Sequence, residues 1–197
     1  MLTGKTVIVG VTGSIAAYKS AYLVRLLKNQ NADVHVIMTE NGAKFISPLT
    51  FETLTGNKCH IDTFDRNFKF DARHISLAKS ADLIIVAPAS ADFIAKASHG
   101  IADDMLTVLL AAKCKKIVAP AMNTGMLLNP ITIDNIERLK HYGFEVTTPD
   151  EGFLACGDIG VGKMPEPELL AEHIYRQIAF EKDMTGFKVL ISAGPTQ

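Results

Sequence analysis

The sequence predicts an α/β fold in which a parallel sheet is connected by helical crossovers. Two observations lead to this prediction. Apolar segments of strand length alternate along the chain with segments of helical period, as in strands joined by helices. Most of the apolar segments are near-continuous runs of valine, isoleucine and leucine, which are typical of strands buried on both faces. The predicted strands are Thr6 to Val11, Val34 to Met38, Leu83 to Ala87, Lys116 to Ala119, Glu145 to Thr147 and Lys188 to Ser192.

The first predicted helix follows the first strand and spans Ser14 to Asn29. Its apolar residues form a stripe that can pack against the sheet, and Lys19 projects into this stripe. A lysine in such a position either extends its charged end to water along the sheet edge or contacts a ligand or a second subunit. The stripe consists of Ile15, Leu23, Leu26 and Leu27.

Two later helices have clear start signals. Asn129 followed by Pro130 is a capping residue and a first-turn proline, and the pair predicts a helix that runs to about His141. Pro165 and Pro167, interleaved with glutamates, open the last long helix.

Two segments fit neither a strand nor a helix pattern. Asn57 to Arg73 is rich in Asp, Asn and Phe, and Asp150 to Met164 contains four glycines. Long connections without regular structure in compact domains are usually functional or mobile.

Composition excludes several classes of protein. The 197 residues carry 20 Lys and Arg against 21 Asp and Glu, so a nucleic-acid-binding surface is not expected. Apolar runs are far shorter than the roughly 20 residues that span a bilayer, and no export signal is recognised. Cys59, Cys114 and Cys156 have neither disulfide-framework nor zinc spacing with the histidines. They indicate free thiols in a reducing cytoplasm, with no metal site.

A glycine-containing turn follows the first strand and leads directly into a helix, over residues 10–15. Such a turn lets the backbone approach an anion, and the helix dipole favours a phosphate there. The spacing matches neither the dinucleotide fingerprint nor the triphosphate loop, so a mononucleotide phosphate fits better. An ordinary strand-to-helix turn explains the segment equally well.

Two more polar turns follow later strands. Ser90 and Asp92 are candidate ligands after the middle strand, although Ser90 is also a typical helix cap. Asn123 follows the next strand, where an amide can bind a carboxylate or simply form a turn. Because ligands gather at the carboxyl ends of parallel strands, we expect these turns to share one sheet edge.

Two reactive side chains lie in less regular segments. His74 precedes a predicted helix and titrates near neutrality, so it is either a base or merely a cap. Cys156 lies on a glycine-rich flap that is followed by Lys163. A thiol with an ordinary pKa of about 8.5 is protonated at pH 7 and can donate a proton to a substrate under such a flap.

Together these motifs resemble the flavin-dependent cysteine decarboxylases. The resemblance covers about residues 4 to 180 and rests on five motifs in order: GVTGSIAAYK at 10–19, HI at 74–75, PASAD at 88–92, PAMN at 120–123 and ACGD at 155–158. It is strongest to the branch that acts on 4'-phosphopantothenoylcysteine in coenzyme A synthesis and that bacteria fuse to a phosphopantothenate–cysteine ligase. The residues VLISAGPTQ at 189–197 look like the start of that ligase. We therefore expect a decarboxylase domain over 1–184, and over 185–197 a linker and the first strand of a truncated ligase domain.

The resemblance implies a Rossmann-like, flavodoxin-like doubly wound sheet that binds FMN, in a cytoplasmic lyase. It also implies a homotrimeric core with FMN near a subunit boundary, and allows a dodecamer in the full-length protein. The implied FMN-binding residues are Gly13, Ser14, Ile15, Thr39, Ser90, Ala91, Asp92, Phe93 and Ala121. Asp92 and Leu127 depart from the residues that relatives usually carry, which bears on how the flavin and the substrate are packed.

The resemblance assigns roles to the reactive residues. His74 is the implied catalytic histidine, Asn123 binds the substrate carboxylate, and Cys156 donates the proton. Ala155 and Lys163 are implied further contacts to substrate, Lys163 meeting its charge. The implied reaction oxidises the cysteine moiety transiently, releases CO2 to give an enethiol, and reduces this to 4'-phosphopantetheine.

Two other interpretations keep the fold. One is a peptidyl-cysteine decarboxylase, against which the apparent ligase start argues. The other is a flavin-binding regulatory subunit that inhibits a partner protein, against which the presence of His74, Asn123 and Cys156 together argues.

Overall fold

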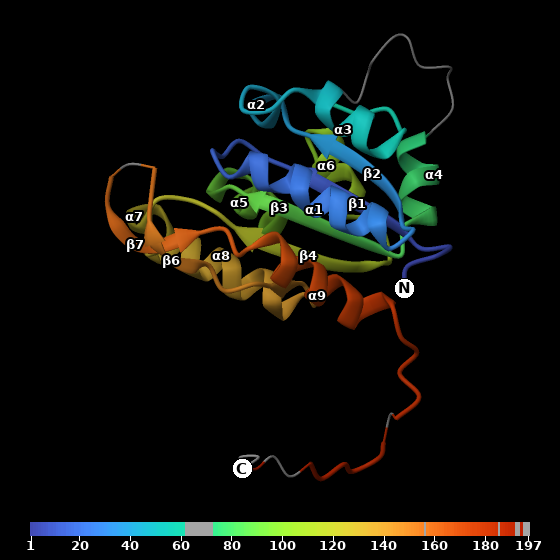
Figure 1. Ribbon diagram of the computed structural model, residues 1–197. Helices are drawn as coiled ribbons and strands as arrows, with labels where there is room; N and C mark the ends of the chain where they lie inside the picture. Colours follow the sequence, from blue (N-terminus) through green and yellow to red (C-terminus); the bar gives the residue numbers. More distant parts are fainter. Residues whose placement is uncertain (62–72, 156, 185, 192–193, 195–197) are drawn as a thin grey trace.

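The computed structural model describes residues 1–61, 73–155, 157–184, 186–191 and 194, without the side chains of residues 73–76 and 109. Its centre is a five-stranded sheet in which every neighbouring pair is parallel, in the order β2-β1-β3-β4-β5 (Figure 1). This is the flavodoxin-like strand order, so the predicted α/β fold is confirmed. The strands are β1 (Thr6–Val11), β2 (Asp33–Met38), β3 (Leu83–Ala89), β4 (Lys115–Pro120) and β5 (Glu145–Val146).

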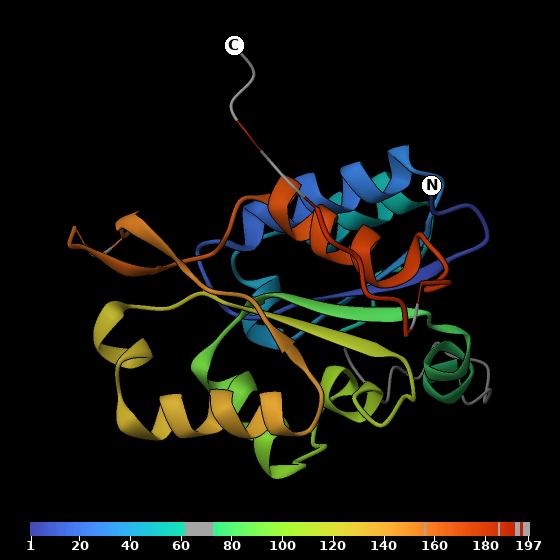
Figure 2. The ribbon, with the colours of Figure 1, turned by 90° about the horizontal axis from the view of Figure 1, so that it is seen from below.

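Helices cover both faces of the sheet, as Figure 2 shows from below. One face carries α1 (Ala17–Asn29), α3 (Pro48–Thr55) and α9 (Pro167–Ile178). The other face carries α4 (Arg73–Ser80), α5 (Ala91–His99), α6 (Met105–Leu109) and α8 (Pro130–His141). Two short helices, α2 (Glu40–Ala43) and α7 (Thr124–Leu127), follow the ends of β2 and β4.

The alternation of side chains along the strands divides the core into two layers. Val7 and Val9 of β1 pack with helices α1 and α9, whereas Ile8 between them packs with the opposite helices. All three are fully buried. A central strand buried on both faces has few polar positions, which is why its sequence is a continuous apolar run.

The glycine-rich segment that fitted no sequence pattern is an antiparallel hairpin. Strands β6 (Asp150–Phe153) and β7 (Ile159–Lys163) pair with each other and stand apart from the main sheet (Figure 1). The expectation of a segment without regular structure was therefore wrong. These strands are short and contain three glycines at positions 152, 160 and 162, so they lack the β-branched alternation that predicts a strand.

Two other predictions need correction. Helix α1 begins at Ala17 rather than Ser14, because residues 12–16 form the turn that leaves β1. The expected strand Lys188 to Ser192 is not formed over Lys188–Ile191, and Ser192 lies outside the described residues. Leu190 is 97% exposed and no described strand lies beside it to pair with. An apolar run alone does not make a strand without a pairing partner.

Within the described ranges, no helix is long and apolar enough to cross a membrane. The same part of the chain contains no cluster of His, Cys, Asp or Glu side chains arranged to hold a metal ion.

Candidate active site

The turns that follow β1, β3 and β4 meet at the carboxyl edge of the sheet. Thr12, fully buried after β1, joins the first two turns: its hydroxyl donates to the Pro88 carbonyl at 2.8 Å and accepts from the Ser90 N–H at 2.9 Å. The third turn is joined in the same way, because the Ala121 N–H donates to the Ala89 carbonyl at 3.0 Å. The expected convergence of the turns is thus present.

The turn after β1 has the geometry of an anion cradle. Among the described residues, the N–H groups of Gly13, Ser14 and Ile15 have no acceptor, and they precede the first turn of α1. At Gly13 a side chain would come within 2.7 Å of Asn41 Cβ, so the backbone of this turn packs closely against helix α2. Unpaired amides at a helix start can bind the phosphate of a mononucleotide, and the turn therefore fits FMN.

A cavity of about 420 Å³ opens beside this turn. Its walls come from residues 14–19, from residues 121–123 after β4, and from the hairpin and the segment after it. It brings together six of the predicted site residues, namely Ser14, Ile15, Ala121, Asn123, Ala155 and Lys163.

Asn123 is oriented by the backbone of the helix that it begins. It is the N-cap of α7, and its Oδ1 accepts from the Gly125 N–H at 2.8 Å. Because this contact fixes the position of Oδ1, it also fixes the position of Nδ2 at the other end of the amide. An amide N–H donor such as Nδ2 can bind a carboxylate.

The hairpin is attached to the turn after β4. The Met122 N–H donates to the Gly162 carbonyl at 3.1 Å, and the Thr124 hydroxyl donates to the Val161 carbonyl at 2.8 Å. Gly162 has φ +146°, and a side chain there would come within 2.1 Å of the Met122 carbonyl oxygen. The contact therefore requires glycine, and it holds the hairpin over the cavity.

The charged end of Lys19 does not extend to water, so that interpretation of Lys19 was wrong. Its side chain is 8% exposed, and its Nζ donates to the Met164 carbonyl at 3.1 Å and to Glu166 Oε1 at 2.9 Å. The same Glu166 oxygen lies 3.0 Å from Lys163 Nζ at the end of β7. Hydrogen bonds from Lys19 and Lys163 hold the pKa of Glu166 below its usual range, and the bond to Glu166 raises the pKa of Lys163.

The remaining predicted flavin residues lie at the same edge but do not line the cavity. Thr39 N–H donates to the Val11 carbonyl at 3.0 Å, and Thr39 caps α2. Ser90 caps α5 by accepting from the Phe93 N–H at 3.3 Å, so the capping interpretation of Ser90 is confirmed. Asp92 lies 3.6 Å from Lys96, and Ala91 begins α5. Phe93 is 2% exposed in the second core layer.

Of the two reactive side chains, neither is described. His74 belongs to the first turn of α4, but its side chain lies outside the described part. Cys156 also lies outside it, between Ala155 and Gly157 in the connection from β6 to β7. Cys59, by contrast, is buried beneath α3, and burial together with the charge of Glu52 raises its pKa to about 12. Cys59 is thus a free thiol, as expected, and its raised pKa disfavours the reactive thiolate.

Sequence reasoning missed the residues that hold the site together. Thr12, Met122, Gly162 and Glu166 were not singled out, because each acts through a partner far away in the chain. The one sequence feature that could have indicated Glu166 is Lys19, because a lysine that is buried within an apolar stripe needs an anionic partner.

The family model described as Flavoprotein matches residues 1–179, and the chain belongs to this family. It is 44% identical over 197 residues to the coenzyme A biosynthesis bifunctional protein CoaBC of Haemophilus influenzae, and 44% identical over 200 residues to that of Bacillus subtilis. The whole chain is covered in both comparisons, but it spans only 49% of each of these relatives. It thus corresponds to about half of such a protein.

Solved structures with the same fold include FMN proteins. A PPC decarboxylase cysteine-to-serine mutant complexed with pantothenoylaminoethenethiol has a TM-score of 0.78 and 29% identity, covering 87% of this chain and 97% of that one. The FMN binding protein AtHal3 has a TM-score of 0.76 and 29% identity, covering 89% of this chain and 97% of that one.

Proposed function

We propose that this chain decarboxylates 4'-phosphopantothenoylcysteine to 4'-phosphopantetheine in coenzyme A biosynthesis, as an FMN-dependent carbon–carbon lyase. The observation that carries the proposal is the cavity at the carboxyl edge of the sheet. It is lined by Asn123, by the turn after β1 and by the hairpin that ends at Lys163. The relatives named for coenzyme A biosynthesis and the PPC decarboxylase structure support the same reaction.

FMN fits the residues present at this edge. The amides of Gly13, Ser14 and Ile15 would hold its phosphate, with Ala121 against the flavin ring. Further contacts would come from Thr39 and the start of α5, over residues 90–93. When bound, FMN supplies a two-electron acceptor that returns the electrons within each turnover.

The remaining steps, which are carboxylate binding, oxidation and protonation, are assigned to separate residues of the chain. Asn123 would hold the carboxylate through Nδ2, because its Oδ1 is engaged at the start of α7. His74 would act in the initial oxidation, and Cys156 would protonate carbon when the enethiol is reduced. The hairpin would exclude water from this step, since Gly162 attaches it to Met122.

The proposal includes the assembly. A trimer with FMN near a subunit boundary is supported by large apolar side chains that are exposed on neighbouring α1 and α3, among them Tyr18, Tyr22 and Leu49. We place the enzyme in the cytoplasm, and the relatives' bifunctional character supports a fused ligase domain in the full-length protein. The dodecamer of the full-length protein stays a prediction from the family resemblance. The domain boundary at residue 184 stays a prediction, near the end of the family match at 179.

The competing substrate is a peptide that ends in cysteine. Structures of the same fold include the peptidyl-cysteine decarboxylase EpiD, with a TM-score of 0.73 and 26% identity, covering 88% of this chain and 99% of that one. The test is CO2 release by the FMN-loaded chain from 4'-phosphopantothenoylcysteine and, separately, from such a peptide. We expect release from the first substrate only. Release from the peptide alone would replace the proposal, and release from neither would favour the regulatory function.

A further inference from the structure

We infer that Thr12 and Ser20 are positioning residues, which hold the two halves of the proposed FMN site in a fixed relative position. This inference rests on the proposed function, because it concerns the FMN site proposed there. One half is the anion cradle of residues 13–15, and the other is the start of α5, over residues 90–93. Neither Thr12 nor Ser20 is proposed to touch the flavin.

The end of β3 leaves the regular ladder of the sheet. Its pairing with β1 ends at Gly10 and Val86. On the other side the register with β4 shifts between Val86 and Ala89, because this stretch of β3 has one residue more than the facing stretch of β4. Ala87 and Pro88 are nevertheless buried, so their carbonyl groups need partners from outside the ladder.

Two buried hydroxyl groups are these partners. Ser20 Oγ donates to the Ala87 carbonyl at 2.6 Å, and Thr12 Oγ1 donates to the Pro88 carbonyl at 2.8 Å. Ser20 is fully buried and Thr12 is 1% exposed, so both hydroxyls are shielded from solvent. A serine inside a helix often bonds to the carbonyl one turn earlier, whereas Ser20 of α1 donates its hydroxyl hydrogen to the sheet.

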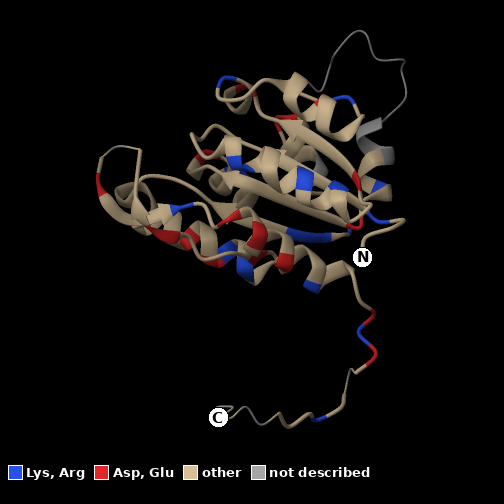
Figure 3. Cartoon of the chain, in the orientation of Figure 1, with Lys and Arg blue, Asp and Glu red and all other residues tan. Residues whose placement is uncertain are grey.

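The two bonds lie on either side of the anion cradle in the sequence. Thr12 immediately precedes residues 13–15, and Ser20 ends the first turn of the helix that follows them. Thr12 Oγ1 also accepts from the Ser90 N–H at 2.9 Å, directly before α5. The chain has no Lys, Arg, Asp or Glu over residues 6–18 and 83–91, which are tan in Figure 3. No ion pair therefore connects these two segments, and neutral hydrogen bonds fix their relative position.

The two halves would contact one FMN molecule, the cradle at its phosphate and the start of α5 near its ring. A ligand that spans two receptors reaches its full affinity only when their separation is held to match it. Riboflavin lacks the phosphate, so the cradle would contribute little to its binding. The inference therefore predicts that Thr12 and Ser20 affect the binding of FMN more than the binding of riboflavin.

The test is the ratio of the dissociation constant for riboflavin to that for FMN, measured by flavin fluorescence when the FMN-free chain is titrated. In Thr12→Val we expect this ratio to fall about tenfold, because the Pro88 carbonyl and the Ser90 N–H lose their hydroxyl partner. The Thr12 N–H still reaches the Pro88 carbonyl at 3.3 Å, so one bond between the turns remains. Thr12→Ser keeps the hydroxyl and should restore the ratio to within about twofold.

Thr55→Val is the matched control. The buried Thr55 hydroxyl makes the same two kinds of bond as Thr12, donating to the Phe51 carbonyl at 2.8 Å and accepting from the Asn57 N–H at 3.0 Å. Thr55 ends α3 beside the start of β2, at the opposite edge of the sheet. This variant should lower the thermal midpoint as Thr12→Val does, but leave the ratio unchanged. Equal weakening of FMN and riboflavin in Thr12→Val, or an equal fall of the ratio in Thr55→Val, would overturn the inference.

Ser20→Ala is a second test, which removes one hydroxyl and leaves both bonds of Thr12 in place. We expect the ratio to fall about threefold, because the Ala87 carbonyl is left buried without its partner. This variant decides the question if Thr12→Val does not fold. An unchanged ratio in Ser20→Ala would overturn the inference.

These outcomes are separable from failure of the proposed function. If the unmodified chain binds FMN no more tightly than riboflavin, the proposed FMN site fails before any variant is compared. If the unmodified chain prefers FMN and both variants keep that preference, only the positioning roles fail.

Discussion

Asn123 combines a structural contact with the binding role proposed for it. Asn123→Asp keeps an oxygen that can accept from the Gly125 N–H, so α7 should still form. The substitution replaces the amide donor by a negative charge that repels the substrate carboxylate. We expect KM to rise by about tenfold or more with the thermal unfolding midpoint unchanged, measured by steady-state assay and melting. Turnover equal to that of the unmodified chain would remove Asn123 from the site.

Cys156 is the proposed donor of the proton that carbon receives when the enethiol is reduced. In Cys156→Ser, oxidation and loss of CO2 should continue, because neither step uses this proton. The enethiol should accumulate, since a hydroxyl is a far weaker acid than a thiol of pKa about 8.5. Mass spectrometry distinguishes the enethiol from 4'-phosphopantetheine by two hydrogens. Normal product from the variant would show that another group donates the proton.

At the residue scale, the sequence located the polar turns but not their connections. Ser14, Asn123 and Lys163 were identified and do line one cavity. Neither interpretation of Lys19 included the ion pair that the structure shows, because its partner Glu166 is 147 positions away in the sequence. The sequence prediction for Ser90 left capping and ligand binding open, and its local hydrogen bond confirms the cap.

The hairpin β6–β7 is the element on which the site depends most. Gly162→Ala would place a methyl group 2.1 Å from the Met122 carbonyl at a left-handed φ, so the hairpin must move. We expect a loss of about 2 kcal/mol or more in unfolding free energy and at least a tenfold lower kcat/KM. Denaturant unfolding and steady-state assays measure the two effects.

Gly152→Ala is the matched control within the same hairpin. A side chain at Gly152 meets only Lys163 Cδ at 3.7 Å, an ordinary contact. Both measurements should stay close to those of the unmodified chain. If the two alanine variants behave alike, the contact between Gly162 and Met122 is not what holds the hairpin.

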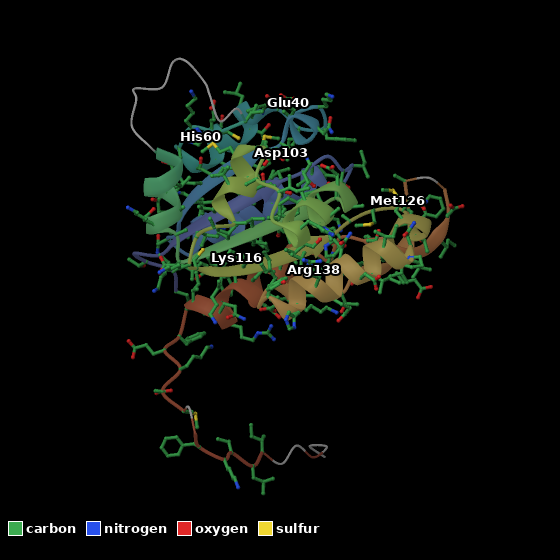
Figure 4. All side chains as sticks on the ribbon, turned by 180° about the vertical axis from the view of Figure 1, so that it is seen from behind. Glu40, His60, Asp103, Lys116, Met126 and Arg138 are labelled. Atoms are coloured by element: carbon green, nitrogen blue, oxygen red, sulfur yellow. The ribbon has the colours of Figure 1, made fainter. Side chains whose placement is uncertain are left out.

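Helix α9 is connected to the edge strand β5 by a group of polar contacts. His173, Arg176 and Gln177 of the helix all contact the carboxylate of Glu145, with Gln177 Nε2 at 2.6 Å. Figure 4 labels Arg138 of α8, the helix that covers the opposite face of the sheet. Partial burial acts to raise the pKa of Glu145, but the hydrogen bonds from His173 and Gln177 and the charge of Arg176 outweigh it. The pKa of Glu145 is therefore lowered in the folded protein.

This shift predicts a dependence of stability on pH. Because the folded-state pKa of Glu145 is below the unfolded-state value, its stabilisation is complete above the unfolded-state pKa and is lost as pH falls through the folded-state pKa. Thermal midpoints measured from about pH 6 to about pH 3 should fall more steeply for the unmodified chain than for Glu145→Gln. Parallel curves would contradict the assignment.

At the element scale, the buried strands were predictable from the sequence because burial on both faces requires continuous apolar runs. The central strands are apolar on both faces and the helix from Pro130 to His141 has its own start signal, so the sequence located them closely. The hairpin has short glycine-containing strands whose pairing depends on the turn after β4, and it was missed. Lys188–Ile191 has the composition of a strand but no described neighbour.

For the whole molecule, exposed apolar side chains predict self-association. Tyr18 is 64% exposed and Leu49 is 66% exposed on helices that contact each other. Sedimentation equilibrium should give a mass of three times the 21.4 kDa of one chain, or a multiple of that trimer. A monomer at micromolar concentration would contradict the trimer, and with it a site that is completed by a neighbouring subunit.

The product made from 4'-phosphopantothenoylcysteine by the FMN-loaded chain tests the central claim most directly. Mass spectrometry, read together with the flavin absorption spectrum, should find 4'-phosphopantetheine and a flavin that ends each turnover oxidised. Unchanged substrate with a folded, FMN-loaded protein would contradict the claim that this cavity performs the decarboxylation.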